Sequence, residues 1–65
     1  MVEYKEKWLV ATAMANHGGG FVSTLGDALL RADGNNTQRI YDAFPEYWQK
    51  YLQIAKDKGY DKEDD

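Results

Sequence analysis

This sequence contains no cysteine, one histidine and one proline among its 65 residues. Without cysteine the chain cannot form a disulfide, an iron–sulfur cluster or a thiolate zinc site, and His17 alone cannot supply a histidine-rich metal site. We therefore expect no cofactor and no bound metal. A chain this short buries only about 60% of the surface that it exposes when unfolded, so association with a partner is the remaining common source of added stability.

The sequence also lacks an excess of basic residues and any long hydrophobic run. Eleven acidic residues outnumber eight basic ones, and the net charge of −3 disfavours binding to nucleic acid backbones. No apolar stretch approaches the roughly 18 residues of a membrane span. The first residues, MVEYKEKW, carry acids and do not have the layout of a signal peptide. We therefore expect a cytoplasmic protein that binds neither membranes nor nucleic acids.

What the sequence does contain is apolar residues at helical spacing, without the alternation typical of strands. Glycine and proline divide this pattern into four expected helices, at about residues 3–16, 20–32 and 35–44 and in the segment PEYWQKYLQIAKDKG that begins at Pro45. Pro45 suits the first turn of the last helix, and Gly59 suits its C-terminal end. The pattern predicts an all-α fold, a compact bundle of three to four short helices in residues 1–60. A disordered acidic tail is expected at residues 61–65.

The same spacing predicts the core. The side chains expected there are those of Trp8, Leu25, Leu29, Ile40, Phe44, Trp48, Tyr51 and Leu52. Gly26, in the middle of the second helix, is unfavourable by about 1 kcal/mol relative to alanine, and a close helix–helix contact would explain its presence. Asp33 is the expected N-cap of the third helix, and Asn35 with Gln38 is a rival capping pair.

The first helix carries apolar residues around most of its circumference. Its central stripe and two flanks are Tyr4–Trp8–Ala11–Ala15, Leu9–Ala13 and Val10–Met14. If the stripe faces the other helices, at least one flank remains exposed and favours a protein partner or a homodimer through this helix. The residues predicted for this partner or dimer surface are Leu9, Val10, Ala13, Met14 and Tyr47. A central position of the helix is the alternative, because it would bury the same side chains within one chain.

Three consecutive glycines, Gly18 to Gly20, separate the first two helices. Backbone N–H groups before a helix can hold an anion, but no lysine follows as in a P-loop and no strand precedes as in a dinucleotide fold. We favour a joint in which Gly18 caps the first helix in the left-handed conformation and the other two glycines allow a tight reversal. His17 has no nucleophile or orienting carboxylate beside it in the sequence. We therefore predict no catalytic residue and expect that the protein is not an enzyme.

The segment STLGDALLRADGNNTQRIYDAF superficially suggests a helix-turn-helix, with Arg31 and Arg39 as contacts to phosphates. Against this interpretation, no apolar residue occupies positions 34–39, where such motifs usually bury one, and the net charge opposes DNA. We therefore expect a small module that binds a protein, and a DNA-binding regulator is the alternative.

The stretch GGGFVSTLGDALLRADGNNTQRIYDAFPEYWQKYL resembles small proteins encoded in bacteriophage and prophage genomes. The resemblance covers about residues 18–52, and FPEYW is its most distinctive part. These proteins have no established activity, so the resemblance implies a setting and not a mechanism. It implies expression in a bacterial cytoplasm, where the protein would act by binding a host or phage protein.

Overall fold

Four helices and no strand make up residues 2–62, the part of the chain that the computed structural model describes. The helices are α1 (Tyr4–His17), α2 (Gly20–Arg31), α3 (Gly34–Ala43) and α4 (Pro45–Asp57). Each begins and ends within about two residues of its expected position. The all-α class predicted from the spacing of apolar residues is therefore confirmed.

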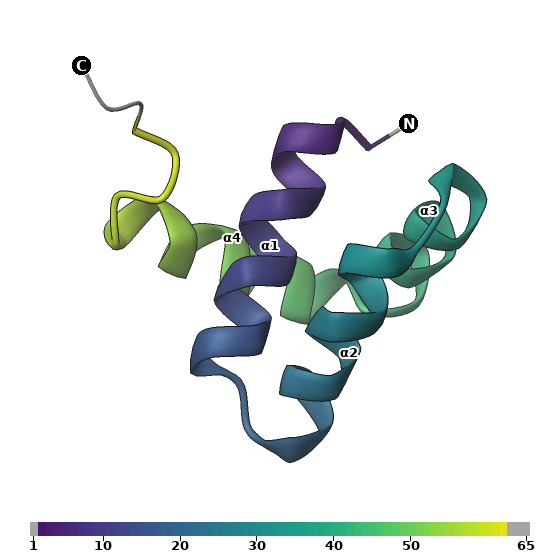
Figure 1. The fold of residues 1–65 in the computed structure, drawn as a ribbon, viewed down its shortest axis with the longest axis horizontal. Helices are drawn as coiled ribbons and strands as arrows, with labels where there is room; N and C mark the ends of the chain where they lie inside the picture. The colour runs from purple at the N-terminus through teal and green to yellow at the C-terminus, as the bar shows by residue number, and fades with distance from the viewer. Residues whose placement is uncertain (1, 63–65) are drawn as a thin grey trace.

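Helix α1 occupies the centre of the bundle and contacts both α2 and α4. In Figure 1 it runs in front of α4, while α2 returns beside it and α3 lies at the outer side of α2. This arrangement encloses both apolar flanks of α1. Val10, Ala13 and Met14 are fully buried, and Leu9 is only 5% exposed. The expectation that one flank of the first helix stays exposed is therefore wrong, and the alternative of a central helix holds.

The stripe of α1 that was expected to face inward instead lies partly at the surface. Tyr4 is 76% exposed and Trp8 is 42% exposed, so the prediction that Trp8 belongs to the core is wrong. The physical reason is that α2 and α4 pack on two sides of α1. The side of α1 that neither of them covers carries these two aromatic residues.

The core consists of side chains from α1, α2 and α4. Its buried members are Leu9, Val10, Ala11, Ala13, Met14, Val22, Leu29, Trp48, Tyr51 and Ala55. Leu25, Ile40 and Leu52, which were also expected in the core, are partly buried and pack against it. The sequence therefore predicted most of the contribution of α2 and α4 and missed that of α1.

Two glycines mark the close approach of α1 and α2. A Cβ added at Gly26 would lie 2.7 Å from Met14 Cβ and 2.8 Å from the backbone nitrogen of Ala15, which confirms the predicted helix–helix contact. A Cβ added at Gly18, the C-cap of α1, would lie 2.7 Å from Val22 Cγ1 of α2 and 2.6 Å from the carbonyl oxygen of Met14. Gly18 has an extended backbone, with φ of −81°, so the expected left-handed cap is wrong. It is the lack of space, and not a positive φ, that requires glycine here.

Local signals placed the ends of the later helices correctly. Asp33 accepts a hydrogen bond of 2.8 Å from the backbone N–H of Asn36, so it is the N-cap of α3. At the end of α4, Gly59 has a φ of +79°, and the N–H of Tyr60 donates to the carbonyl oxygen of Ala55 at 2.9 Å, as in a Schellman motif. Most of the tail expected at residues 61–65 lies outside the described residues.

Candidate functional site

Three aromatic rings meet at the surface where α3 ends and α4 begins. The ring centroids of Phe44 and Tyr47 are 5.9 Å apart and the rings are inclined by 26°. Phe21, from the first turn of α2, lies 5.9 Å from Phe44 and 6.3 Å from Tyr47. These separations are within the range of favourable aromatic pairs. We call Phe21, Phe44 and Tyr47 the aromatic cluster.

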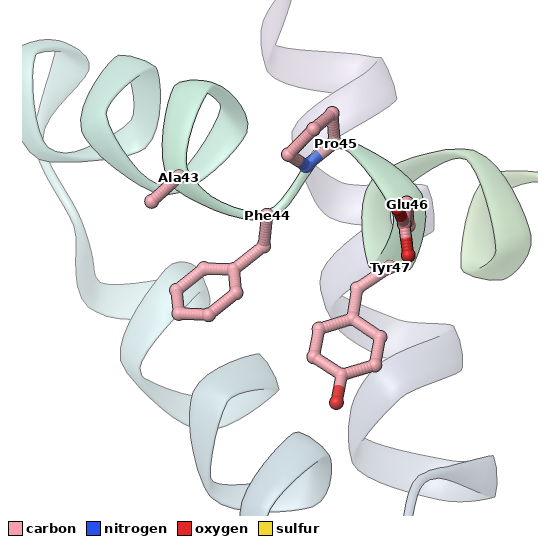
Figure 2. A pocket seen from close by; sticks show the side chains of 5 residues that line it. All are labelled: Ala43, Phe44, Pro45, Glu46 and Tyr47. Atoms are coloured by element: carbon pink, nitrogen blue, oxygen red, sulfur yellow. The ribbon is translucent and has the colours of Figure 1, made fainter.

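The junction of α3 and α4 brings two of these rings together. Phe44 is both the C-cap of α3 and the N-cap of α4, with φ of −130° and ψ of 58°. Pro45 disfavours a helical conformation at the residue before it and fits the first position of a helix, so α3 ends and α4 begins without a loop. Phe44 and Tyr47 are three residues apart and point to the same side of the junction (Figure 2). The next residue, Trp48, enters the core.

The aromatic cluster borders an open pocket. This pocket has a volume of about 410 Å³ and is lined by Ala43, Phe44, Pro45, Glu46 and Tyr47, as Figure 2 shows. Phe21 is 60% exposed and Tyr47 is 36% exposed, while Phe44 is half-buried. The cluster therefore presents a large part of its ring area to solvent, and a partner can reach it without any rearrangement of the core.

Glu46 adds a negative charge to the lining of this pocket. It lies in the first turn of α4, where the helix dipole favours an acidic side chain. Lys50 is one turn further along, at the spacing of a helical ion pair, but its Nζ lies over the ring of Tyr51, 5.5 Å from the centroid. Among the described residues, none forms a hydrogen bond or ion pair with the Glu46 carboxylate. The pocket thus combines aromatic rings with a carboxylate that no residue in the described part of the chain pairs.

The structure places the five residues predicted as a partner or dimer surface in two different environments. Leu9, Val10, Ala13 and Met14 are in the core, where they cannot form an interface while the chain is folded. Tyr47 lies at the surface, in the aromatic cluster. Sequence reasoning missed Phe21 and Glu46 as site residues and assigned Phe44 to the core. A sequence signal that could have found this region is the stretch FPEYW, which places three aromatic residues within five positions around Pro45.

The single histidine has a structural partner. His17 Nε2 and the hydroxyl oxygen of Tyr60 are 2.7 Å apart, and the two rings stack with centroids separated by 6.1 Å. This contact joins the end of α1 to the turn that follows α4. In residues 2–62 no group of three His, Cys, Asp or Glu side chains is arranged to hold a metal ion.

The segment considered as a helix-turn-helix forms α2 and α3, joined by Ala32 and Asp33. Arg31 and Arg39, the proposed phosphate contacts, are both exposed. Thr37 is 4% exposed and is the buried residue of α3, at a position where the motif would bury an apolar side chain. Its hydroxyl oxygen has no hydrogen-bond partner within the described chain.

The aromatic cluster and its pocket are therefore the candidate site, identified from geometry alone.

No helix in residues 2–62 has both the length and the apolar character needed to cross a membrane. No family model, no curated protein and no solved structure matches the chain at a significant level.

Proposed function

We propose that this chain is a small protein-interaction module that docks on a partner protein through the aromatic cluster, without catalysis. The observation that carries the proposal is the exposure of Phe21 and Tyr47, which with the half-buried Phe44 form three contacting rings beside a pocket of about 410 Å³. Aromatic residues are enriched at protein interfaces and at the positions that contribute most of the binding energy. Each ring offers a large apolar area with few rotamers to immobilise on binding.

The exposed rings differ from isolated surface aromatics, which are common and need no explanation. Phe21 leaves 60% of its surface in solvent although it touches two other rings. The core is complete without it, since Leu29 and Trp48 are already fully buried. A contiguous apolar patch that the core does not use is typical of a docking surface.

The resemblance to phage and prophage proteins supports a setting for this proposal. The partner would be a host or phage protein in a bacterial cytoplasm, and binding would act by occupying a surface of that protein. The alternative is a regulator whose target is DNA. The acidic charge of the chain opposes this alternative.

Site-specific photo-crosslinking in bacterial cells tests the proposal. A photoreactive phenylalanine analogue at Tyr47 is expected to give a discrete crosslinked protein, and the same analogue at the exposed Gln53 of α4 is the control. Phe21→Ser should abolish the crosslink from position 47, because it removes one ring of the cluster. An equal crosslink from position 53, or one from position 47 that survives Phe21→Ser, would contradict docking through the cluster.

The salt dependence of the binding affinity distinguishes a DNA target from a protein target. A protein that contacts several phosphates loses duplex DNA affinity steeply as salt rises. We expect no mobility shift of duplex DNA at about physiological salt. Tight and steeply salt-dependent binding that Arg31→Ala and Arg39→Ala weaken would favour the regulator instead.

A further inference from the structure

We infer that the pocket beside the aromatic cluster takes an arginine side chain of the partner, flanked by apolar residues. This inference rests on the proposed function and names the chemistry of the partner. It follows from three features of the pocket: the Glu46 carboxylate, the ring faces and the volume.

The carboxylate of Glu46 favours a cationic occupant. Glu46 lines the pocket and has no hydrogen bond or ion pair with any described residue. Lys50, the cation best spaced to neutralise it, lies over the ring of Tyr51. The chain as a whole has a net charge of −3, so its field attracts a basic partner and slows association with an acidic one.

The rings favour a cation that also has a flat apolar face. Phe44 and Tyr47 are inclined by only 26° to each other, and a planar group can lie against such a surface. Elsewhere in the chain the tyrosine rings already attract cations, since Lys7 Nζ lies 5.7 Å from the ring centroid of Tyr4. In contrast, no cation of the described residues lies over any ring of the aromatic cluster.

Arginine matches these requirements better than lysine does. Its guanidinium is planar and weakly hydrated, stacks on aromatic faces and binds a carboxylate with two parallel hydrogen bonds. A lysine ammonium is compact and strongly hydrated, so it gains less from leaving water for a ring face.

The volume of the pocket is sufficient for a long side chain. About 410 Å³ lies near the lower end of the range for ligand sites, roughly 300–1,000 Å³. The pocket therefore accommodates one long side chain and its immediate apolar neighbours, while the exposed face of Phe21 extends the contact along the surface.

Binding of a short peptide to the ¹⁵N-labelled protein tests the inference. The probe is acetyl-Leu-Arg-Leu-amide, and the matched control is the same peptide with citrulline, which has the shape of arginine without its charge. We expect the arginine peptide to shift the amide signals of Phe21 and residues 44–47 and to bind about fivefold or more tightly than the citrulline peptide. Glu46→Gln should reduce this difference, leaving only the contribution of the rings and the net charge, whereas Glu3→Gln, a matched change at an exposed acid in another part of the chain, should retain it in full.

The outcomes separate this inference from the proposed function. If both peptides bind at the cluster with the same affinity, the arginine inference is overturned while docking through the rings stands. If neither peptide shifts residues 44–47, the arginine inference is also overturned, and crosslinking from position 47 then decides the proposed function independently. Loss of the difference in Glu3→Gln would likewise overturn the role of Glu46.

Discussion

The indole Nε1–H of Trp48 donates a hydrogen bond of 2.9 Å to Oε2 of Glu6, a residue 42 positions earlier in the chain. Trp48 is fully buried, and its ring also meets the edge of Tyr41 at a centroid distance of 5.1 Å. A buried indole has a single donor, and leaving it without an acceptor is unfavourable. Glu6 therefore connects the first turn of α1 to α4 through the largest side chain of the core.

Replacing Glu6 by alanine measures how much this hydrogen bond contributes to the free energy of unfolding. Glu6→Ala leaves the Trp48 donor buried and unpaired, so we expect the free energy of unfolding to fall by about 1–3 kcal/mol. Glu3→Ala is the matched control, because Glu3 makes no side-chain capping bond and should change stability by less than about 0.5 kcal/mol. Urea denaturation followed by circular dichroism measures both. Equal effects of the two substitutions would show that the helix dipole, and not the indole, accounts for the role of Glu6.

Gly26→Ala should destabilise the protein although alanine favours helices. The new methyl group would lie 2.9 Å or less from Met14 Cβ and from backbone atoms of α1, so the two helices would have to separate. We expect the overpacking to cost up to about 3 kcal/mol, more than the roughly 1 kcal/mol gained in helix propensity, so the free energy of unfolding should fall. Gly20→Ala is the control, since nothing lies within 4 Å of a Cβ there, and it should leave stability unchanged or raise it by up to about 1 kcal/mol. Thermal denaturation of both variants tests the difference.

The positions of the helices were predictable because their signals are local. Asp33 caps a helix that begins one residue later, and Pro45 and Gly59 mark a start and an end within their own turns. The contact at Gly26 was also predictable, because a glycine in the middle of a helix is unfavourable unless a neighbour needs the space.

The orientation of α1 was not predictable from its own sequence. Apolar residues surround most of this helix, so its pattern does not determine which side faces inward. The answer depends on α2 and α4 packing on two sides of it, which are tertiary contacts with distant segments. The aromatic cluster was hidden for the same reason. Phe21 and Phe44 are 23 positions apart and meet only when α2 and the junction before α4 are placed in space.

A charge on the buried side of α1 should unfold the protein. Met14 is fully buried against α2, so Met14→Glu places an unpaired carboxylate in the core, an effect comparable to the total stability of a small domain. We expect loss of the cooperative thermal transition measured by circular dichroism. Tyr4→Glu, a charge of the same sign on the 76% exposed residue of the same helix, should keep that transition. A folded monomer of Met14→Glu would contradict the central position of α1 and restore an interface on this flank.

The two tryptophans should differ in their fluorescence, because one is fully buried and the other is partly exposed. Trp48 is fully buried, whereas Trp8 is 42% exposed on the uncovered side of α1. In Trp8→Phe the remaining Trp48 should emit at shorter wavelength and resist quenching by iodide, since its indole is excluded from water. Trp8→Phe should also reduce stability by less than Trp48→Phe, because Trp8 leaves 42% of its surface in solvent whereas Trp48 is fully buried.

The complementary variant, Trp48→Phe, shows whether the difference in quenching comes from the burial of each indole or from removing any tryptophan. In Trp48→Phe, Trp8 remains as the emitter and should be quenched by iodide in the folded protein more strongly than Trp48 is in Trp8→Phe, because part of its surface is in solvent. This variant should also lose stability, because it removes ring volume from the core and leaves Glu6 without its donor. Equal protection of the two indoles from iodide would mean that Trp8 is buried, as the sequence pattern suggests, and that α1 is rotated relative to the structure. Protection of Trp8 that appears only at high protein concentration would instead show that a second molecule covers this side of α1.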